Sequence, residues 1–202
     1  MVRFLTADLH LGHARICEYT GRPFTSVEEM NDWLIDAWNE RVRPGDEVFV
    51  LGDVVLGRVT ETLPLVSELQ GTLHLVVGNH DRPFEAGPRR PEWQARYRAA
   101  GFRSITYGSR ELDLGLESPV LACHFPYEGD SLGEERFEEL RPADLGQRLV
   151  HGHLHGQYRR RGRMVDVGVD AWAGRPVAFE EVAALFLADE EAVAPLPWRR
   201  EA

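Results

Sequence analysis

The sequence contains no lysine, only two cysteines and no long apolar run. Cys17 and Cys123 stand far apart and form no CxxC pair, which excludes a disulfide-stapled scaffold and is typical of a reduced, intracellular protein. No segment approaches the roughly 20 consecutive apolar residues that a membrane helix needs. We therefore expect a cytoplasmic protein without a membrane span. All 23 basic residues are arginines.

Positive charge is also scarce in total, because the 23 basic residues face 33 acidic ones and the formal net charge is −10. Nucleic-acid binding rests on the neutralisation of phosphates by basic side chains, so a protein whose main task is to coat nucleic acid is disfavoured. The arginines do cluster at Arg159, Arg160, Arg161 and Arg163. We interpret this cluster as a solvated hairpin turn around Gly162, and a role at the mouth of a cleft is the alternative.

A chain of 202 residues suits one globular domain, which we expect over residues 1–187, followed by a peripheral tail over 188–202. Strands are predicted over residues 2–7, 47–52 and 72–78, and helices over 26–42, 58–69 and 92–100. This alternation favours a parallel α/β unit. Short extended segments at 102–107, 111–114, 120–123, 148–151 and 164–169 then predict a second, more antiparallel sheet.

Five apolar runs are each followed, at their carboxyl ends, by residues that bind metals or protons. The residues at these ends are Asp8 and His10, Asp53, Asn79 with His80 and Asp81, His124, and His153 with His155. The carboxyl edge of an α/β sheet is where ligands bind. Carboxylates, a carboxamide and imidazoles without cysteine suit Mn²⁺, Fe or Zn²⁺. The donors are too many for one ion but suit two ions about 3.5 to 4 Å apart.

With these motifs the sequence resembles the calcineurin-like metallophosphoesterases, from Asp8 to His155. The motifs Asp-x-His, Gly-Asp, Gly-Asn-His-Asp, an isolated His and Gly-His-x-His follow one another in the family's order. The strings DLHLGH, RPF, HGHLHG and VGVDAW also look like a group of small bacterial and phage members. One departure is that the Gly-Asp motif reads GDVVLG, without the second acidic residue of GDxxD. This departure bears on the support around the site more than on metal binding.

The resemblance implies a four-layer α/β/β/α sandwich of two mixed sheets flanked by helices, and a metal-dependent hydrolase of phosphoric esters. It implies a first ion held by Asp8, His10, Asp53 and His155, and a second held by Asp53, Asn79, His124 and His153. Mn²⁺ is the favoured ion, with Fe, Zn²⁺, Ni²⁺ or Co²⁺ as alternatives. A hydroxide that bridges the two ions would attack phosphorus in line. His80 would contact the scissile phosphate and protonate the leaving oxygen, with Asp81 orienting its ring.

Residues outside this ligand set have weaker signals. Arg22 and Arg82 are candidates to clamp the substrate phosphate, because a guanidinium binds phosphate bidentately, and Asp170 is expected to support the site from a neighbouring loop. His13 and His151 adjoin the motifs without an assigned role.

The favoured substrate is a small phosphomonoester or phosphodiester such as a nucleotide. A nuclease or nucleic-acid end-processing enzyme is the alternative, for which the arginine cluster is the one positive feature, and a non-catalytic metal-binding scaffold is a third. The loops at 18–25, 84–91 and 127–140 carry no readable code for the substrate, and the sequence leaves the oligomeric state open.

Overall fold

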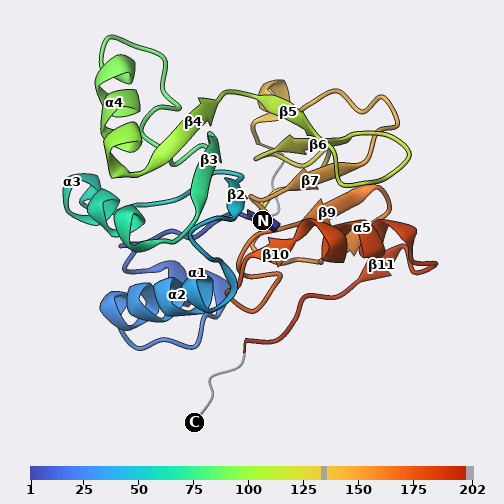
Figure 1. Ribbon diagram of the computed structural model, residues 1–202, viewed down its shortest axis with the longest axis horizontal. Helices are drawn as coiled ribbons and strands as arrows, with labels where there is room; N and C mark the ends of the chain where they lie inside the picture. Colours follow the sequence, from blue (N-terminus) through green and yellow to red (C-terminus); the bar gives the residue numbers. More distant parts are fainter. Residues whose placement is uncertain (133–135, 199–202) are drawn as a thin grey trace.

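The computed structural model of the chain describes residues 1–132 and 136–198, and it contains two β-sheets with helices packed around them (Figure 1). The first sheet has five strands in the order β10-β1-β2-β3-β4. Strands β1 to β4 are parallel, and β10 is antiparallel to β1. The bounds are β1 Arg3–Thr6, β2 Glu47–Val50, β3 Thr72–Val76, β4 Phe102–Thr106 and β10 Val177–Ala178. The first three predicted strands are therefore confirmed, in a parallel arrangement.

The second sheet has six strands in the order β11-β8-β9-β7-β6-β5. Its strands are β5 Ser109–Leu112, β6 Val120–Cys123, β7 Leu149–His151, β8 Arg160–Arg161, β9 Met164–Asp166 and β11 Ala192–Val193. The middle strands β6, β7 and β9 are parallel, while the outer pairs are antiparallel. The prediction that residues 102–107 belong to this sheet is wrong, because β4 pairs with β3. The preceding helix supplies the crossover that a parallel pair requires.

The helices include the three that the sequence predicts, one of which proline interrupts, and two that it does not predict, α1 and α5. They are α1 Ile16–Thr20, α2 Val27–Arg41, α3 Val59–Thr62, α4 Arg90–Ala100 and α5 Phe179–Leu187, with short 3₁₀ segments η1 Leu63–Glu68 and η2 Glu138–Leu140. The helix predicted over 58–69 is thus divided into α3 and η1, since Pro64 has no N–H to continue the α-helical hydrogen bonds. No helix within the described residues combines the length and apolar character of a membrane span.

Helix α2 begins where its sequence signals predict. The backbone N–H of Glu29 donates to Ser26 Oγ at 3.1 Å, which satisfies one of the amides that a helix start leaves unpaired. Met30, Leu34 and Trp38 recur on one face and are fully buried against the first sheet. The cap and the apolar face together fix this helix on the sheet beside the functional loops.

Alternation along the strands separates the layers of the core. In β1, Phe4 packs with the cluster under the helices and Leu5 packs with the cluster between the sheets. In β6, Val120 points to the same cluster between the sheets, and Leu121 packs on the outer side of the second sheet. Successive side chains of a strand face opposite ways, so each of these strands contributes to two clusters. The two mixed sheets pack face to face through the cluster between them, and helices cover the other side of the first sheet. This confirms the predicted α/β/β/α class.

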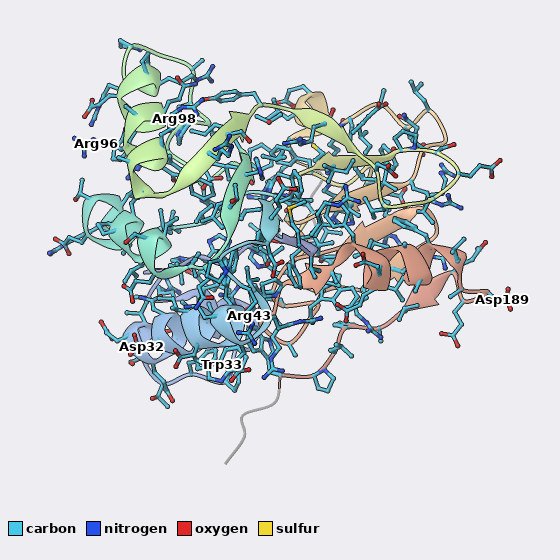
Figure 2. All side chains as sticks on the ribbon, in the orientation of Figure 1. Asp32, Trp33, Arg43, Arg96, Arg98 and Asp189 are labelled. Carbon is cyan, nitrogen blue, oxygen red and sulfur yellow. The ribbon has the colours of Figure 1, made fainter. Side chains whose placement is uncertain are left out.

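The C-terminal segment packs against the molecule more closely than the sequence indicates. Strand β11 pairs with β8, and the backbone N–H of Leu196 donates to the Ala171 carbonyl at 3.0 Å. The Trp198 ring lies 5.7 Å from Phe24 and 5.6 Å from Trp33, centroid to centroid; Trp33 is on the lower side of α2 in Figure 2. Residues 192–198 are thus part of the packed structure, and residues 199–202 of the predicted tail lie outside the described residues.

The arginine cluster after His155 is engaged within the protein. Arg160 is buried, and its guanidinium donates to the carbonyls of Leu185, Ala188 at 2.9 Å and Glu190 at 2.8 Å. These carbonyls lie at the end of α5, where a helix leaves its last acceptors unpaired. The other three contacts are Arg159 to the Ala194 carbonyl at 2.8 Å, Arg161 to Glu128 at 3.2 Å and Arg163 to Asp144 at 2.7 Å.

Replacing Arg160 tests this anchoring role. We expect Arg160→Ala to lower the free energy of unfolding by about 2 to 3 kcal/mol, because buried carbonyls lose a charged donor. Urea unfolding followed by circular dichroism measures the change. Arg103→Ala, at an exposed position on β4, is the control and should change stability by under about 0.5 kcal/mol. Equal stability of the two variants would contradict the anchoring role.

Candidate metal centre

The predicted ligands lie just past the carboxyl ends of β1, β2, β3, β6 and β7, where the loops of both sheets meet. The backbone N–H of Asp8 donates to the Gly52 carbonyl at 3.0 Å, and that of His10 donates to the Asp53 carbonyl at 3.0 Å. Across the sheets, the His153 N–H donates to Asp8 Oδ2 at 2.9 Å. These hydrogen bonds hold the loops of the two sheets in fixed positions around one buried pocket.

The backbone at this pocket is strained at the predicted ligands. Seven non-glycine residues of the described part have a positive φ, and five of them are Asp8 (57°), His10 (50°), Asp53 (55°), His153 (71°) and His155 (49°). Each such residue costs roughly 1 to 2 kcal/mol. Strained residues of this kind cluster at functional sites, where the surrounding structure holds them in place. The chain therefore maintains unfavourable backbone geometry at the residues that carry the chemistry.

One group of donors consists of Asp8, His10 and His155, whose ligand atoms all lie within 4.8 Å of one another. Asp8 Oδ1 and both ring nitrogens of His10 are buried without a hydrogen-bond partner among the described residues. An unsatisfied buried polar atom costs about 1 to 3 kcal/mol. A cation bound between these atoms would satisfy them, so the group fits a metal ion.

A second group consists of Asp8, Asp53 and His124, again with ligand atoms within 4.8 Å. Asp53 Oδ2 lies 3.6 Å from His10 Nε2 and 3.6 Å from His124 Nε2. These distances are too long for hydrogen bonds, yet they leave one carboxylate oxygen equally close to an imidazole of each group. Asp53 Oδ2 therefore lies between the rings of His10 and His124, while Asp8 belongs to both groups.

The contact between His124 and Asn79 also fits a cation. His124 Nδ1 lies 2.7 Å from the Leu51 carbonyl, which only accepts, so the ring proton is on Nδ1. Burial lowers the pKa of His124 and keeps the ring neutral. His124 Nε2 then presents a lone pair to Asn79 Oδ1, 2.9 Å away. Two atoms that can each donate a lone pair and lie this close together are placed as neighbouring ligands of one cation would be.

The electrostatics of the pocket disfavour bare charge. Burial raises the pKa of Asp8 well above its ordinary value; the neighbouring His155 opposes this effect, and the Asp53 carboxylate adds to it. Burial, with the positive charges of His155 and Arg22, lowers the pKa of His10 well below its ordinary value. A divalent cation favours ionised carboxylates and neutral imidazoles. The pocket thus supplies a desolvated donor set whose ionic form depends on a bound cation.

Comparison with known proteins agrees with this geometry. The family model described as calcineurin-like phosphoesterase matches residues 2–157. The chain belongs to the calcineurin-like phosphoesterase family. This membership identifies it as an enzyme that hydrolyses phosphate esters with the help of metal ions.

Similar proteins come from phages and an archaeon. The chain is 34% identical to the Gene 66 protein of Mycobacterium phage L5 over 194 residues, covering 89% of this chain and 91% of the phage protein. It is 42% identical to the uncharacterized protein MJ1445 of Methanocaldococcus jannaschii over 191 residues, covering 90% and 89%. A crystal structure of the Aquifex aeolicus protein AQ665 superposes with a TM-score of 0.68 at 20% identity, covering 91% and 98%. That likeness shows the shared fold.

Arg22 has a different position in this phosphoesterase from the one predicted. It is buried and donates to both oxygens of Asp170, at 2.8 and 2.9 Å. It also donates to the backbone carbonyls of Asp8 at 2.7 Å and Leu9 at 2.9 Å. A clamp on substrate phosphate would require these bonds to break, so the structure contradicts that prediction. The sequence alone does not show whether an arginine side chain is buried against protein partners or exposed to a substrate.

Asp170 links this arginine to a predicted ligand, as expected of a supporting residue. His155 Nδ1 donates to Asp170 Oδ2 at 2.9 Å, which leaves Nε2 free to face Asp8. Burial opposes ionisation of Asp170, but Arg22 and His155 keep its pKa well below the ordinary value. The same contact, together with the Asp8 charge, raises the pKa of His155 to about 9 against the effect of burial. The ring orientation of His155 is therefore fixed by a permanently charged partner.

Asp130 fixes the ring of His153 in the way that Asp170 fixes the ring of His155, and the sequence did not predict this role. Asp130 is buried, and its Oδ2 lies 2.9 Å from His153 Nε2. Its other oxygen accepts from Arg136 at 2.6 Å and from the Leu132 N–H at 3.0 Å. Burial raises the pKa of Asp130, but the bonds from Arg136, Leu132 and His153 outweigh it and lower that pKa to about 2. Its position in the loop at 127–140, far from any motif, gave no signal.

Asp81 also departs from its predicted role of orienting His80. Its carboxylate accepts from the backbone N–H groups of Asp53 at 3.0 Å, Val54 at 3.1 Å and Gly78 at 2.9 Å. Asp81 is buried, whereas His80 is exposed. Asp81 therefore joins the loop after β2 to the loop after β3, and its oxygens are committed to backbone amides.

The remaining histidines divide into two kinds. His13 lies near the centre, with its ring 5.6 Å from that of His10. His151 is buried between the Gly152 carbonyl at 2.7 Å and the Tyr158 hydroxyl at 3.1 Å, which is a structural role. His74 stacks on Phe49 at 4.9 Å in the first sheet, away from the loops.

Removing the charge of Asp53 tests the pocket as a metal site. We expect Asp53→Asn to bind Mn²⁺ at least about tenfold more weakly, because the shared carboxylate becomes a neutral amide. Mn²⁺ should therefore raise the melting temperature of the wild type and leave that of the variant almost unchanged. Scanning calorimetry and elemental analysis provide the two measurements.

Asp32→Asn is the control for this experiment, because Asp32 is exposed on α2 (Figure 2). It should bind Mn²⁺ like the wild type. Full metal content in Asp53→Asn would rule out the shared position of this residue.

A second test concerns the support of His153. We expect Asp130→Ala to weaken Mn²⁺ binding about 10 to 100-fold, the usual loss when the partner of a ligand histidine is removed. Titration calorimetry measures the affinity, and the ¹⁵N shifts of His153 report its tautomer. Asp144→Ala is the matched control, because Asp144 pairs with Arg163 in the same way but lies at the surface. If both variants bind Mn²⁺ equally well, Asp130 does not position the ring.

Proposed function

We propose that this phosphoesterase hydrolyses small phosphomonoesters or phosphodiesters, such as nucleotides, at a two-metal centre. The observation that carries the proposal is the position of Asp53, whose Oδ2 lies 3.6 Å from an imidazole nitrogen on either side. A carboxylate between two donor groups is the arrangement that a bridged pair of ions requires.

The donors divide into two sets around Asp53. The first ion would be held by Asp8, His10, Asp53 and His155, and the second by Asp53, Asn79, His124 and His153. The proximity of Asp8, His10 and His155, the position of Asp53 Oδ2 between His10 and His124, and the contact between His124 and Asn79 support this division. Nitrogen and oxygen donors without sulfur favour Mn²⁺, with Fe, Zn²⁺, Ni²⁺ or Co²⁺ as alternatives. When bound, such ions lower the pKa of a shared water and polarise the phosphoryl oxygens.

The chain's own contribution to turnover is assigned to His80. Its backbone N–H donates to Asp53 Oδ1 at 2.9 Å, and its ring lies 5.5 Å from that of His10. The side chain is exposed, so an ester arriving from solvent can reach it. We assign to its ring nitrogen the donation of a proton to the leaving oxygen, which is general acid catalysis.

The small substrate is favoured over nucleic acid. The four arginines at 159–163, which were the positive feature for a nuclease, contact carbonyls or carboxylates of the protein. A phosphate backbone would have to displace these contacts, the buried ones of Arg160 above all. The complete set of donors in one pocket weighs against a non-catalytic scaffold, because a scaffold needs no strained and desolvated ligands.

The role of His80 is tested by comparing leaving groups. We expect His80→Ala to reduce kcat about 10² to 10⁴-fold on an alkyl phosphate ester, whose leaving alkoxide needs a proton. The loss should be much smaller on bis(p-nitrophenyl) phosphate, since p-nitrophenolate leaves without one. Steady-state assays with Mn²⁺, together with the metal content of each variant, measure these effects.

His74→Gln is the control, because this imidazole lies in the first sheet outside the pocket. It should keep both activities. A His80→Ala variant that loses its metal but keeps its rate per bound ion would overturn the assignment. If the metal-loaded wild type hydrolyses none of a panel of monoesters, diesters and cyclic nucleotides, the proposed function itself fails.

A further inference from the structure

A cleft of about 470 Å³ lies beside the metal centre, between the loop after β2, the loop after β3 and the start of α4. Its charged and aromatic lining consists of Arg58, Arg82, Glu85, Arg89, Arg90 and Trp93. None of these residues belongs to the donor set of the centre. The cleft is therefore distinct from the metal centre, although both lie at the carboxyl ends of the strands of the first sheet.

The cleft adjoins the centre through two segments. Gly57, in its wall, packs so closely on the loop of His10 that a Cβ there would lie 2.5 Å from the Gly12 carbonyl oxygen. Arg82 follows Asp81 directly and stands two positions after His80. Both segments leave the carboxyl ends of parallel strands, where substrates of α/β enzymes bind. A molecule whose ester lies at the centre therefore has this cleft as its neighbour.

The lining is strongly positive in a chain of formal charge −10. It holds four arginines and one carboxylate, Glu85. Arg58 is 3.3 Å from Glu61, Arg89 is 3.7 Å from Glu92, and Arg90 donates to the carbonyls of Phe84 and Glu85.

Arg82 differs from these three arginines. It is exposed and has no ion pair among the described residues. Its guanidinium lies 5.8 Å from the Trp93 ring, as does that of Arg89. The cleft thus offers one unpaired cation and a second one with a weak, exposed partner, and both adjoin the same tryptophan, whose ring also lies 4.9 Å from the guanidinium of Arg96. Two guanidinium groups in this arrangement suit a phosphate, whose oxygens accept several charged hydrogen bonds.

We propose that this cleft binds a second phosphate group of the substrate, remote from the ester that is cleaved. The proposal rests on the proposed function and narrows its substrate class to small molecules with two phosphates. A nucleic-acid strand needs a continuous series of free cations, whereas this cleft offers only Arg82 and the weakly paired Arg89. The arginines at 159–163 already contact carbonyls or carboxylates of the protein, which a strand would have to displace.

The test uses ligands that cannot be hydrolysed, so that binding is measured apart from turnover. Alkane-α,ω-bisphosphonates with two to eight carbons are titrated calorimetrically into the Mn²⁺-loaded protein, each beside the matching alkylphosphonate. We expect a bisphosphonate of at least one spacer length to bind at least about tenfold more tightly than the matching monophosphonate. A further charged hydrogen bond gives a gain in affinity of this size. This advantage should fall to under about twofold in the double variant Arg82→Gln, Arg89→Gln.

Arg103→Gln, which removes one exposed arginine outside the cleft, is the matched control and should keep the full advantage. Equal affinity of mono- and bisphosphonates at every length would overturn the proposal, as would an advantage that survives in the double variant. Tighter, Arg82-dependent binding of a single-stranded oligonucleotide than of any bisphosphonate would overturn the small-molecule class. Because the phosphonates are not cleaved, their relative affinities do not depend on whether the ester panel is hydrolysed.

Discussion

Asp8 and Asp53 are two carboxylates in one desolvated pocket, and this unfavourable pairing is the constraint on which the structure depends. Like charges in a low dielectric repel strongly, and burial already disfavours the ionised form of Asp8. The imidazoles compensate only in part: His155 carries a charge that favours ionised Asp8, whereas burial keeps His10 and His124 neutral. A bound cation is the partner that relieves the repulsion, and the strained backbone at the ligands holds the pocket ready for it.

Permanent charges lie one step outside this pocket and fix the rings that face it. The Arg22–Asp170 pair orients His155, and the Arg136–Asp130 pair orients His153. In each case an arginine keeps the carboxylate ionised, and the carboxylate then fixes which ring nitrogen carries the proton. The two pairs come from loops of different strands. The centre therefore depends on the whole edge where the two sheets meet, and not on the motifs alone.

Asp81 holds together two of the loops around the centre. Its carboxylate accepts hydrogen bonds from three backbone amides and so joins the loops that carry Asp53 and His80. His80 itself is left exposed. The buried residue thus maintains the loops, while the exposed one is available to the substrate.

The sequence by itself determined the parallel strands, the helix from Ser26, the α/β/β/α class and the placement of the seven predicted ligands, Asp53 among them, at the ends of strands. These follow from local signals: apolar runs, a capping residue, and polar motifs placed at strand ends. Only the tertiary structure decided the partner of β4, the burial of Arg22, the contacts of Asp81 and Asp130, and the packing of Trp198 on Trp33. A guanidinium or a carboxylate looks the same in a sequence whether it meets solvent or another charge. Its role is set by partners distant along the chain, such as Asp170 for Arg22, which become neighbours only when the sheets pack.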